Sequence, residues 1–230
     1  GRTMEYFKVP IDALKVALAW DIVNAEAVVA PFFQEDLVPE PDRFLVFDPF
    51  PGAPRVLDEP GTTYGNIEAA IRFHRTLAET DIAAYASRGF WKTPSMEPAG
   101  AAVTVFYPAL STWGASAQRS LLGGVASLEI GYYDSRDDRS GDDPAVPNSQ
   151  ALLLAGFQRE IATDFTVGVQ YRAEWMMENR AYRHNLPAGF PEQDRVRHTM
   201  TLRLTQFLDY QAWKLSLFAI VGLSEGDFTW

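Results

Sequence analysis

The chain has 230 residues, 47% of hydrophobic type, so it is long and apolar enough to bury a sizeable core and is not expected to be disordered. A formal net charge of −10 argues against a nucleic-acid-binding protein, because there is no basic excess to neutralise phosphates. Cysteine is absent, which excludes disulfide bonds, thiolate metal sites and cysteine nucleophiles. No run of about 18 apolar residues occurs, so no transmembrane helix is expected, whereas the short alternating strands of a membrane barrel stay compatible with the composition.

Apolar and polar residues alternate along the whole chain, and this period of two predicts about ten β-strands. In residues 164–175, DFTVGVQYRAEW, an apolar set that begins at Phe165 and ends at Trp175 alternates with a polar set that includes Arg172 and Glu174. A strand directs successive side chains to opposite faces, so this stretch has one apolar and one polar face. The predicted strands cover residues 14–21, 26–34, 66–77, 81–91, 105–119, 124–135, 151–161, 164–175, 196–207 and 212–223.

Short and long connections alternate between these strands. The short ones have the sequences IVNA, AET, SLLG, AT and LDY, and the long ones span residues 35–65, 92–102, 136–150 and 176–195. Outer-membrane barrels have this asymmetry, with tight turns at one end and long loops at the other. The strand lengths also match the ~9 to 11 residues that cross a bilayer obliquely. The chain is therefore predicted to be all-β, an antiparallel up-and-down transmembrane β-barrel.

Alternation alone leaves two arrangements open for the charged faces of the strands. In a soluble barrel they would face solvent, and in a membrane barrel they would line a watery interior. The predicted pore-lining residues are Glu68, Arg72, His74, Glu129, Arg172, Glu174, Arg197, Arg203 and Lys214. Basic residues outnumber acidic ones in this set, which favours anionic or sugar-acid solutes. Ion pairs between neighbouring strands that only brace the wall are the alternative interpretation.

Four tryptophans lie at or near the ends of predicted strands. They are Trp20, Trp91, Trp175 and Trp213. Because indole rings favour the headgroup boundary of a bilayer, this placement predicts two aromatic girdles at the membrane interfaces. Large aromatic side chains that cap a soluble core would give the same spacing. Strand length, loop asymmetry and the tryptophans together favour the membrane barrel.

Several stretches also resemble a known family. They are EYFKVPIDALKV, AYASRGFWKTP, WGASAQRS, GYYDSRDDRSGDDPAVPNSQ, AYRHNLPAG and HTMTLRLTQFL. The chain resembles the β-barrel region of an uncharacterised, porin-like family of Gram-negative outer-membrane proteins, broadly similar to alginate-export barrels. The resemblance spans essentially the whole chain. It implies that residues 1–230 form a single barrel region in the bacterial outer membrane and belong to a larger barrel, with a complete ten-stranded barrel as the alternative.

The expected function is a porin-like or exporter-like channel, without enzymatic activity, for passive passage of small hydrophilic solutes, anionic ones among them. Its expected partners are outer-membrane lipid, lipopolysaccharide and the solutes, with no nucleic acid, no cofactor and no metal, and a homo-oligomer is left open. The Asp-rich stretch RDDRSGDDPAVPNSQ has the composition of a cation-collecting loop or, more simply, of a solvated turn-rich loop.

Two other functions compete with the channel. A soluble β-barrel that binds an apolar ligand would direct its apolar faces inward. An outer-membrane lipid hydrolase would need an activated nucleophile, but the three histidines, His74, His184 and His198, lie in no recognisable nucleophile motif and the GxSxG signature is missing.

Overall fold

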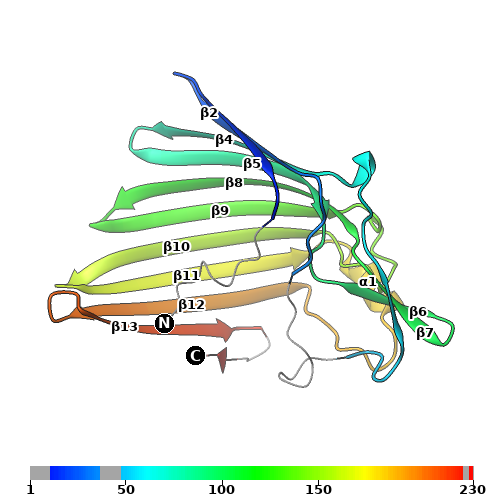
Figure 1. The fold of residues 1–230 in the computed structure, drawn as a ribbon. Coiled ribbons are helices and arrows are strands. Elements are labelled where there is room, and N and C mark those ends of the chain that lie inside the picture. The colour runs from blue at the N-terminus through cyan, green and yellow to red at the C-terminus, as the bar shows by residue number, and fades with distance from the viewer. Residues whose placement is uncertain (1–10, 37–47, 225–227, 230) are drawn as a thin grey trace.

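A large antiparallel sheet dominates the computed structural model, which describes residues 11–36, 48–224 and 228–229. Its strands are β1 (Leu14–Ala19), β2 (Asn24–Ala30), β4 (Glu68–Leu77), β5 (Thr80–Phe90), β8 (Ala109–Leu121), β9 (Gly124–Ser135), β10 (Gln150–Ala162), β11 (Phe165–Met176), β12 (Val196–Leu208), β13 (Trp213–Gly222) and β14 (Phe228–Thr229). They follow one another in the sheet in the same order as in the chain (Figure 1). The predicted all-β, antiparallel architecture is therefore confirmed.

The five short connections predicted from the sequence are tight turns, and Figure 1 shows them gathered at one end of the sheet. We call this the turn end, and the opposite end, where the long connections lie, the loop end. The turn between β4 and β5 consists of Ala78 and Glu79, both with positive φ (45° and 65°). Two left-handed residues match the right-handed twist of the flanking strands, which explains the tight closure without the usual Asn-Gly pair.

A second, three-stranded sheet lies within the long connections and was missed by the sequence analysis. It consists of β3 (Arg55–Asp58), β7 (Ala102–Phe106) and β6 (Ser95–Ala99), with β3 parallel and β6 antiparallel to β7. The only α-helix in the described ranges, α1 (Asn179–Asn185), and the short 3-10 helix η2 (Tyr64–Asn66) also lie in long connections. Strands of four or five residues are too short for alternation to be recognised.

Prolines explain where two predicted strands differ from the observed ones. The predicted strand 105–119 is interrupted after β7 by Tyr107 and Pro108, and β8 starts only at Ala109. The strand predicted to reach residue 34 stops one residue before Pro31. Proline has no N–H to donate to a neighbouring strand, so pairing ends beside it.

The register of the main sheet gives it an apolar and a polar face. Residues directly opposite each other on paired strands share a face, and Val169, for example, lies opposite both Phe157 and Leu202. The apolar face defined in this way has large exposed side chains on most strands, with Leu128 49% and Ile130 56% exposed. The intervening residues form the polar face, and the alternation predicted from the sequence persists over most of the sheet. Exceptions are Leu152 and Leu154 on the polar face and Arg75 and Arg159 on the apolar face.

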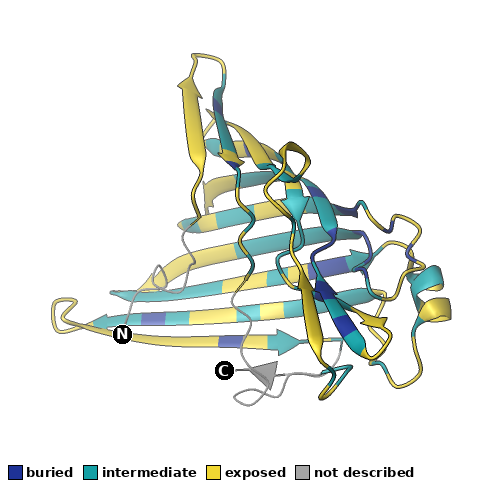
Figure 2. Cartoon of the chain, turned by 45° about the vertical axis from the view of Figure 1, so that its right-hand side comes forward, coloured by how far each residue is buried: buried dark blue, intermediate teal, exposed yellow. Residues whose placement is uncertain are grey.

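Buried side chains are few, and most of the larger ones lie near the loop end (Figure 2). Val103, Tyr107 and Pro108 are buried there, whereas the strands of the main sheet contribute mainly buried alanines. The solvent-accessible surface area of the chain is 16039 Å². A compact soluble protein of this mass would expose only about 10,000 Å². The apolar face is therefore not the core of the structure.

The strands described here leave the main sheet open. β1 pairs with β2 alone, and β14 pairs with β13 at the opposite edge. Figure 1 shows the sheet as a curved wall. Within the described ranges, no helix is long and apolar enough to cross a membrane.

Candidate functional site

All nine side chains predicted to line a pore belong to the polar face. They are Glu68, Arg72, His74, Glu129, Arg172, Glu174, Arg197, Arg203 and Lys214. The register adds three acids that the sequence analysis missed, Glu26, Asp81 and Glu160, and one base, Lys15. Six basic and six acidic side chains then occupy this face of the described strands, so the expected basic excess is absent there.

Ion pairs fix several of these charges toward the loop end. The Glu174 carboxylate lies 2.6 Å from the Arg172 guanidinium and 3.5 Å from that of Arg197. Its side chain is only 11% exposed. A carboxylate this well covered needs both guanidinium groups to offset its lost hydration, so the three side chains hold β11 and β12 together.

A second ion-pair cluster connects the first three strands of the sheet. Glu26 on β2 lies 2.6 Å from Lys15 on β1 and 3.2 Å from Arg72 on β4. The Arg72 guanidinium also lies 5.7 Å from the ring centre of Tyr85 on β5, within cation–π range. Arg72 therefore contacts both neighbouring strands.

Glu68 anchors the segment that follows β5. Its carboxylate accepts hydrogen bonds from Lys92 Nζ (2.6 Å) and from the backbone N–H of Phe90 (3.3 Å). Lys92 Nζ also lies 4.2 Å from the ring centre of Phe33. The ring of Phe33 packs against those of Phe90 and Tyr107, so aromatic and ionic contacts join in one cluster at the loop end.

The tryptophans predicted as interface residues lie in different surroundings. Trp175 and Trp213 are on the apolar face at opposite ends of the sheet, and Trp20, in the turn after β1, is 56% exposed. Trp91 instead packs on the polar-face side, where its Nε1–H donates to Ser135 (3.4 Å) and its ring contacts Tyr133. The sequence analysis passed over Trp113, which is 47% exposed on the apolar face and stacked on Tyr132.

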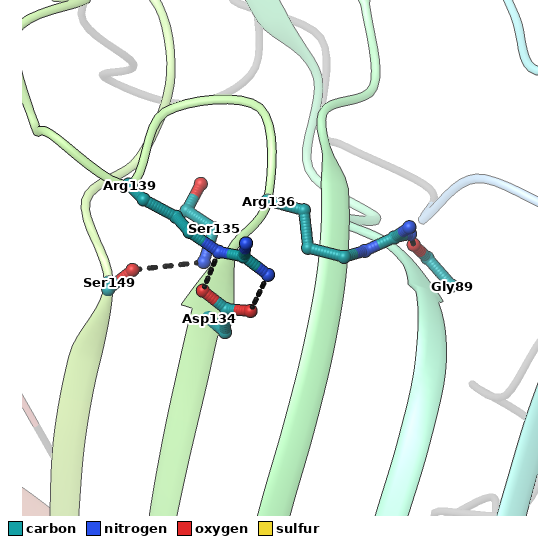
Figure 3. A network of polar contacts seen from close by, with 6 residues as sticks. All are labelled: Gly89, Asp134, Ser135, Arg136, Arg139 and Ser149. Atoms are coloured by element: carbon teal, nitrogen blue, oxygen red, sulfur yellow. Dashed lines mark hydrogen bonds and ion pairs between the residues drawn. The ribbon is translucent and has the colours of Figure 1, made fainter.

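Figure 3 shows how the Asp-rich connection between β9 and β10 begins. Asp134 accepts two hydrogen bonds from Arg139, at 2.9 and 2.7 Å, and Ser149 Oγ accepts one from the Ser135 N–H. Arg136 donates to the Gly89 carbonyl, 2.8 Å away, and burial lowers the pKa of its guanidinium. The connection is thereby fixed to the ends of β9 and β5.

Asp138 organises the rest of this connection. Its carboxylate accepts hydrogen bonds from the backbone N–H groups of Gly141, Asp142 and Asp143. Burial by itself raises the pKa of the Asp138 carboxyl, but these donors and the Ser140 hydroxyl outweigh it and leave the pKa below its ordinary value. The described residues contain no group of three or more His, Asp or Glu side chains that could hold a metal ion.

Toward the turn end, the polar face of strands β8 to β13 has a depression of about 440 Å³ in place of the ion pairs found toward the loop end. Its polar lining consists of Gln118, Ser127, Glu129, Gln158, Gln170, Thr201 and Arg203. None of these side chains forms a hydrogen bond or an ion pair with another described residue. Gly156 lies in its floor, and a Cβ there would come within 2.6 Å of Ser127 Oγ, so glycine keeps the depression open.

The three histidines lie far apart in the chain, and only His198 has a side-chain partner in the described ranges. Its Nδ1 is 2.6 Å from the Tyr171 hydroxyl on the neighbouring strand, and the two rings stack.

No family model, curated protein or solved structure matches the chain.

Proposed function

We propose that this chain forms the wall, or part of the wall, of a channel in a bacterial outer membrane, through which small hydrophilic solutes pass passively. In this proposal the apolar face contacts lipid and the polar face lines water. One observation carries it: a single sheet, with all its tight turns at one end, exposes large apolar side chains on one face and charged ones on the other.

The exposed apolar face favours this proposal over a soluble barrel. A soluble monomer rarely exposes a contiguous apolar patch of more than a few hundred Å², whereas here Leu128, Ile130, Leu215 and Leu217 are all about half exposed or more. A soluble barrel with an apolar ligand inside would direct these side chains inward. Lipid tails cover such a face without the interdigitated packing that a soluble core requires.

The pairing of charges indicates which side chains a passing solute can reach. The polar-face bases Lys15, Arg72, Arg172 and Arg197 are occupied by carboxylates. Lys214 lies near the Phe207 ring. Arg203 is the basic side chain of the described polar face that has no partner among the described residues, and it lines the depression together with Glu129. We therefore assign contact with anionic solutes to Arg203.

The proposal is tested by purifying the full chain with and without detergent and inserting it into planar bilayers. We expect it to stay dispersed only in detergent and to produce ion conductance in the bilayer. A monomer that is stable in buffer without detergent and produces no conductance would overturn the proposal.

Substituting Arg203→Glu should shift the ion selectivity of that conductance toward cations, because it reverses an unpaired charge on the pore wall. The matched control is Arg159→Glu, which makes the same charge change near the turn end but on the apolar face, and it should leave the selectivity unchanged. Reversal potentials in a salt gradient measure the shift. A selectivity that is equal in the wild type and Arg203→Glu would place Arg203 away from the solute path.

A further inference from the structure

A shallow trough of about 430 Å³ lies on the apolar face, over the seam between β5 and β8. Its floor consists of Ala84, Ala115 and Ala117. Larger side chains on the strands at either side form its walls, with Phe73 on β4 and Ile130 on β9. Apart from Ile82 on β5, which also lines it, small side chains on two paired strands lie between large ones on the next two, and this leaves the trough open.

The trough has different chemistry at its two ends. Toward the loop end, the next residue of β8 on this face beyond Ala115 is Trp113, whose ring stacks on Tyr132. Toward the turn end it reaches Arg75, which lines it directly, and Arg119 lies one cross-strand row further along β8. Both arginines lie on the apolar face, as do Arg88 and Arg159 outside the trough.

These arginines are available for a ligand outside the protein. Arg75 forms no ion pair or hydrogen bond with any described residue. Arg119 lies 3.7 Å from Glu79, and both side chains of that pair are more than half exposed. On a lipid-facing surface a guanidinium near a strand end extends to the headgroup level, where phosphate oxygens match its planar donors.

The stretch of β8 from Trp113 to Arg119, which contains the trough and its flanking residues, matches one lipid chain in length. Trp113 and Arg119 are separated by six residues of β8, which is roughly 20 Å along a strand. At the ~45° tilt of membrane strands this covers about 14 Å of depth, close to half of the ~30 Å hydrocarbon core. The trough together with its flanking residues, from Trp113 to Arg119, therefore extends across about one leaflet.

We propose that this trough binds one phospholipid of the leaflet at the turn end. One acyl chain lies over Ala84, Ala115 and Ala117 with its methyl end near Trp113, and the phosphate is held by Arg75 and Arg119. The inference rests on the proposed function, because it requires the apolar face to contact lipid.

The test uses the detergent-purified full chain, to which phosphatidylglycerol is added, and counts the bound lipid by native mass spectrometry. The double variant Arg75→Gln/Arg119→Gln should reduce the affinity for phosphatidylglycerol roughly 30-fold, because the loss of each arginine reduces it about fivefold and the two losses multiply. Ala115→Leu fills the floor and should reduce it without touching the arginines. Arg159→Gln is the matched control, since Arg159 lies on the same face near the turn end but outside the trough.

Diacylglycerol with the same acyl chains, which lacks the phosphate, should bind no better to the wild type than to the double variant. Equal phosphatidylglycerol binding by wild type, double variant and Ala115→Leu would overturn the inference, as would an equal loss in Arg159→Gln. If the chain still needs detergent and conducts, those outcomes contradict only the lipid-binding inference, and the channel proposal stands. A chain that is a stable monomer in buffer without detergent and does not conduct would remove both proposals together.

Discussion

The two halves of the polar face differ in how their side chains are used. Toward the loop end, Glu68 and Glu174 are each held by basic side chains, and Glu174 is almost completely covered. Toward the turn end, Gln158, Gln170 and Arg203 belong to the same face of the same strands but have no partner among the described residues. On β9 to β12 the same alternation therefore produces a braced half and a half whose polar groups are left to water or to a ligand. On β1 to β5, by contrast, Glu26, paired with Arg72, and Thr76, bonded to Asp81, lie toward the turn end.

The difference separates two roles that an alternating sequence cannot distinguish. A charge paired across strands stabilises the wall, because part of its hydration has been replaced by a fixed partner. An unpaired charge keeps its hydration and can exchange it for a solute. Arg172 and Arg203 have the same side chain and lie on adjacent strands, but Arg172 is paired with Glu174 and Arg203 is unpaired among the described residues.

The largest effect is expected from removing the carboxylate of the braced half. Glu174→Ala leaves Arg172 and Arg197 facing each other without their shared partner and should lower the free energy of unfolding by about 3 kcal/mol. Glu129→Ala, which removes a glutamate that lines the depression and has no partner among the described residues, should change it by less than about 0.5 kcal/mol. Urea titrations in detergent micelles compare the two. Equal losses would mean that the two halves do not differ energetically.

A smaller, local effect is expected at Asp138, in the connection at the loop end. Because its pKa is lowered in the folded chain, its contribution to stability is present above the ordinary Asp pKa of about 4 and is lost as the pH falls through the lower folded value. Amide hydrogen exchange of Gly141 and Asp143 should accelerate, beyond the intrinsic pH dependence, over that range. Asp138→Asn should remove the extra acceleration. Persistence of the acceleration in the variant would assign it to another group.

The smallest effect is expected at the turn end, from the exposed pair of Glu79 and Arg119. Substituting Glu79→Gln should change the free energy of unfolding by less than about 1 kcal/mol, because both side chains are well hydrated and the pair is long, at 3.7 Å. The same urea titration measures it. A loss as large as that of Glu174→Ala would show that exposure is a poor guide to the strength of these pairs.

Periodicity predicted the hairpins of the main sheet and the face on which each charge lies, because alternation over ten or more residues is a strong signal. It did not reveal β3, β6 and β7, which are too short to show a period. It also missed Glu26, which lies opposite Arg72 only because of the register between β2 and β4. Pairing between strands separated by a long connection depends on that register, and the sequence of either strand does not contain it.

The connectivity of the main sheet has a consequence for the way in which the chain acquires its structure. Five of its strand pairs close over turns of at most four residues. Closing such short loops costs little chain entropy, so each hairpin can form locally before its neighbours are in place. Assembly of the wall is then a stepwise addition of preformed hairpins, and the long connections set the order in which these units meet.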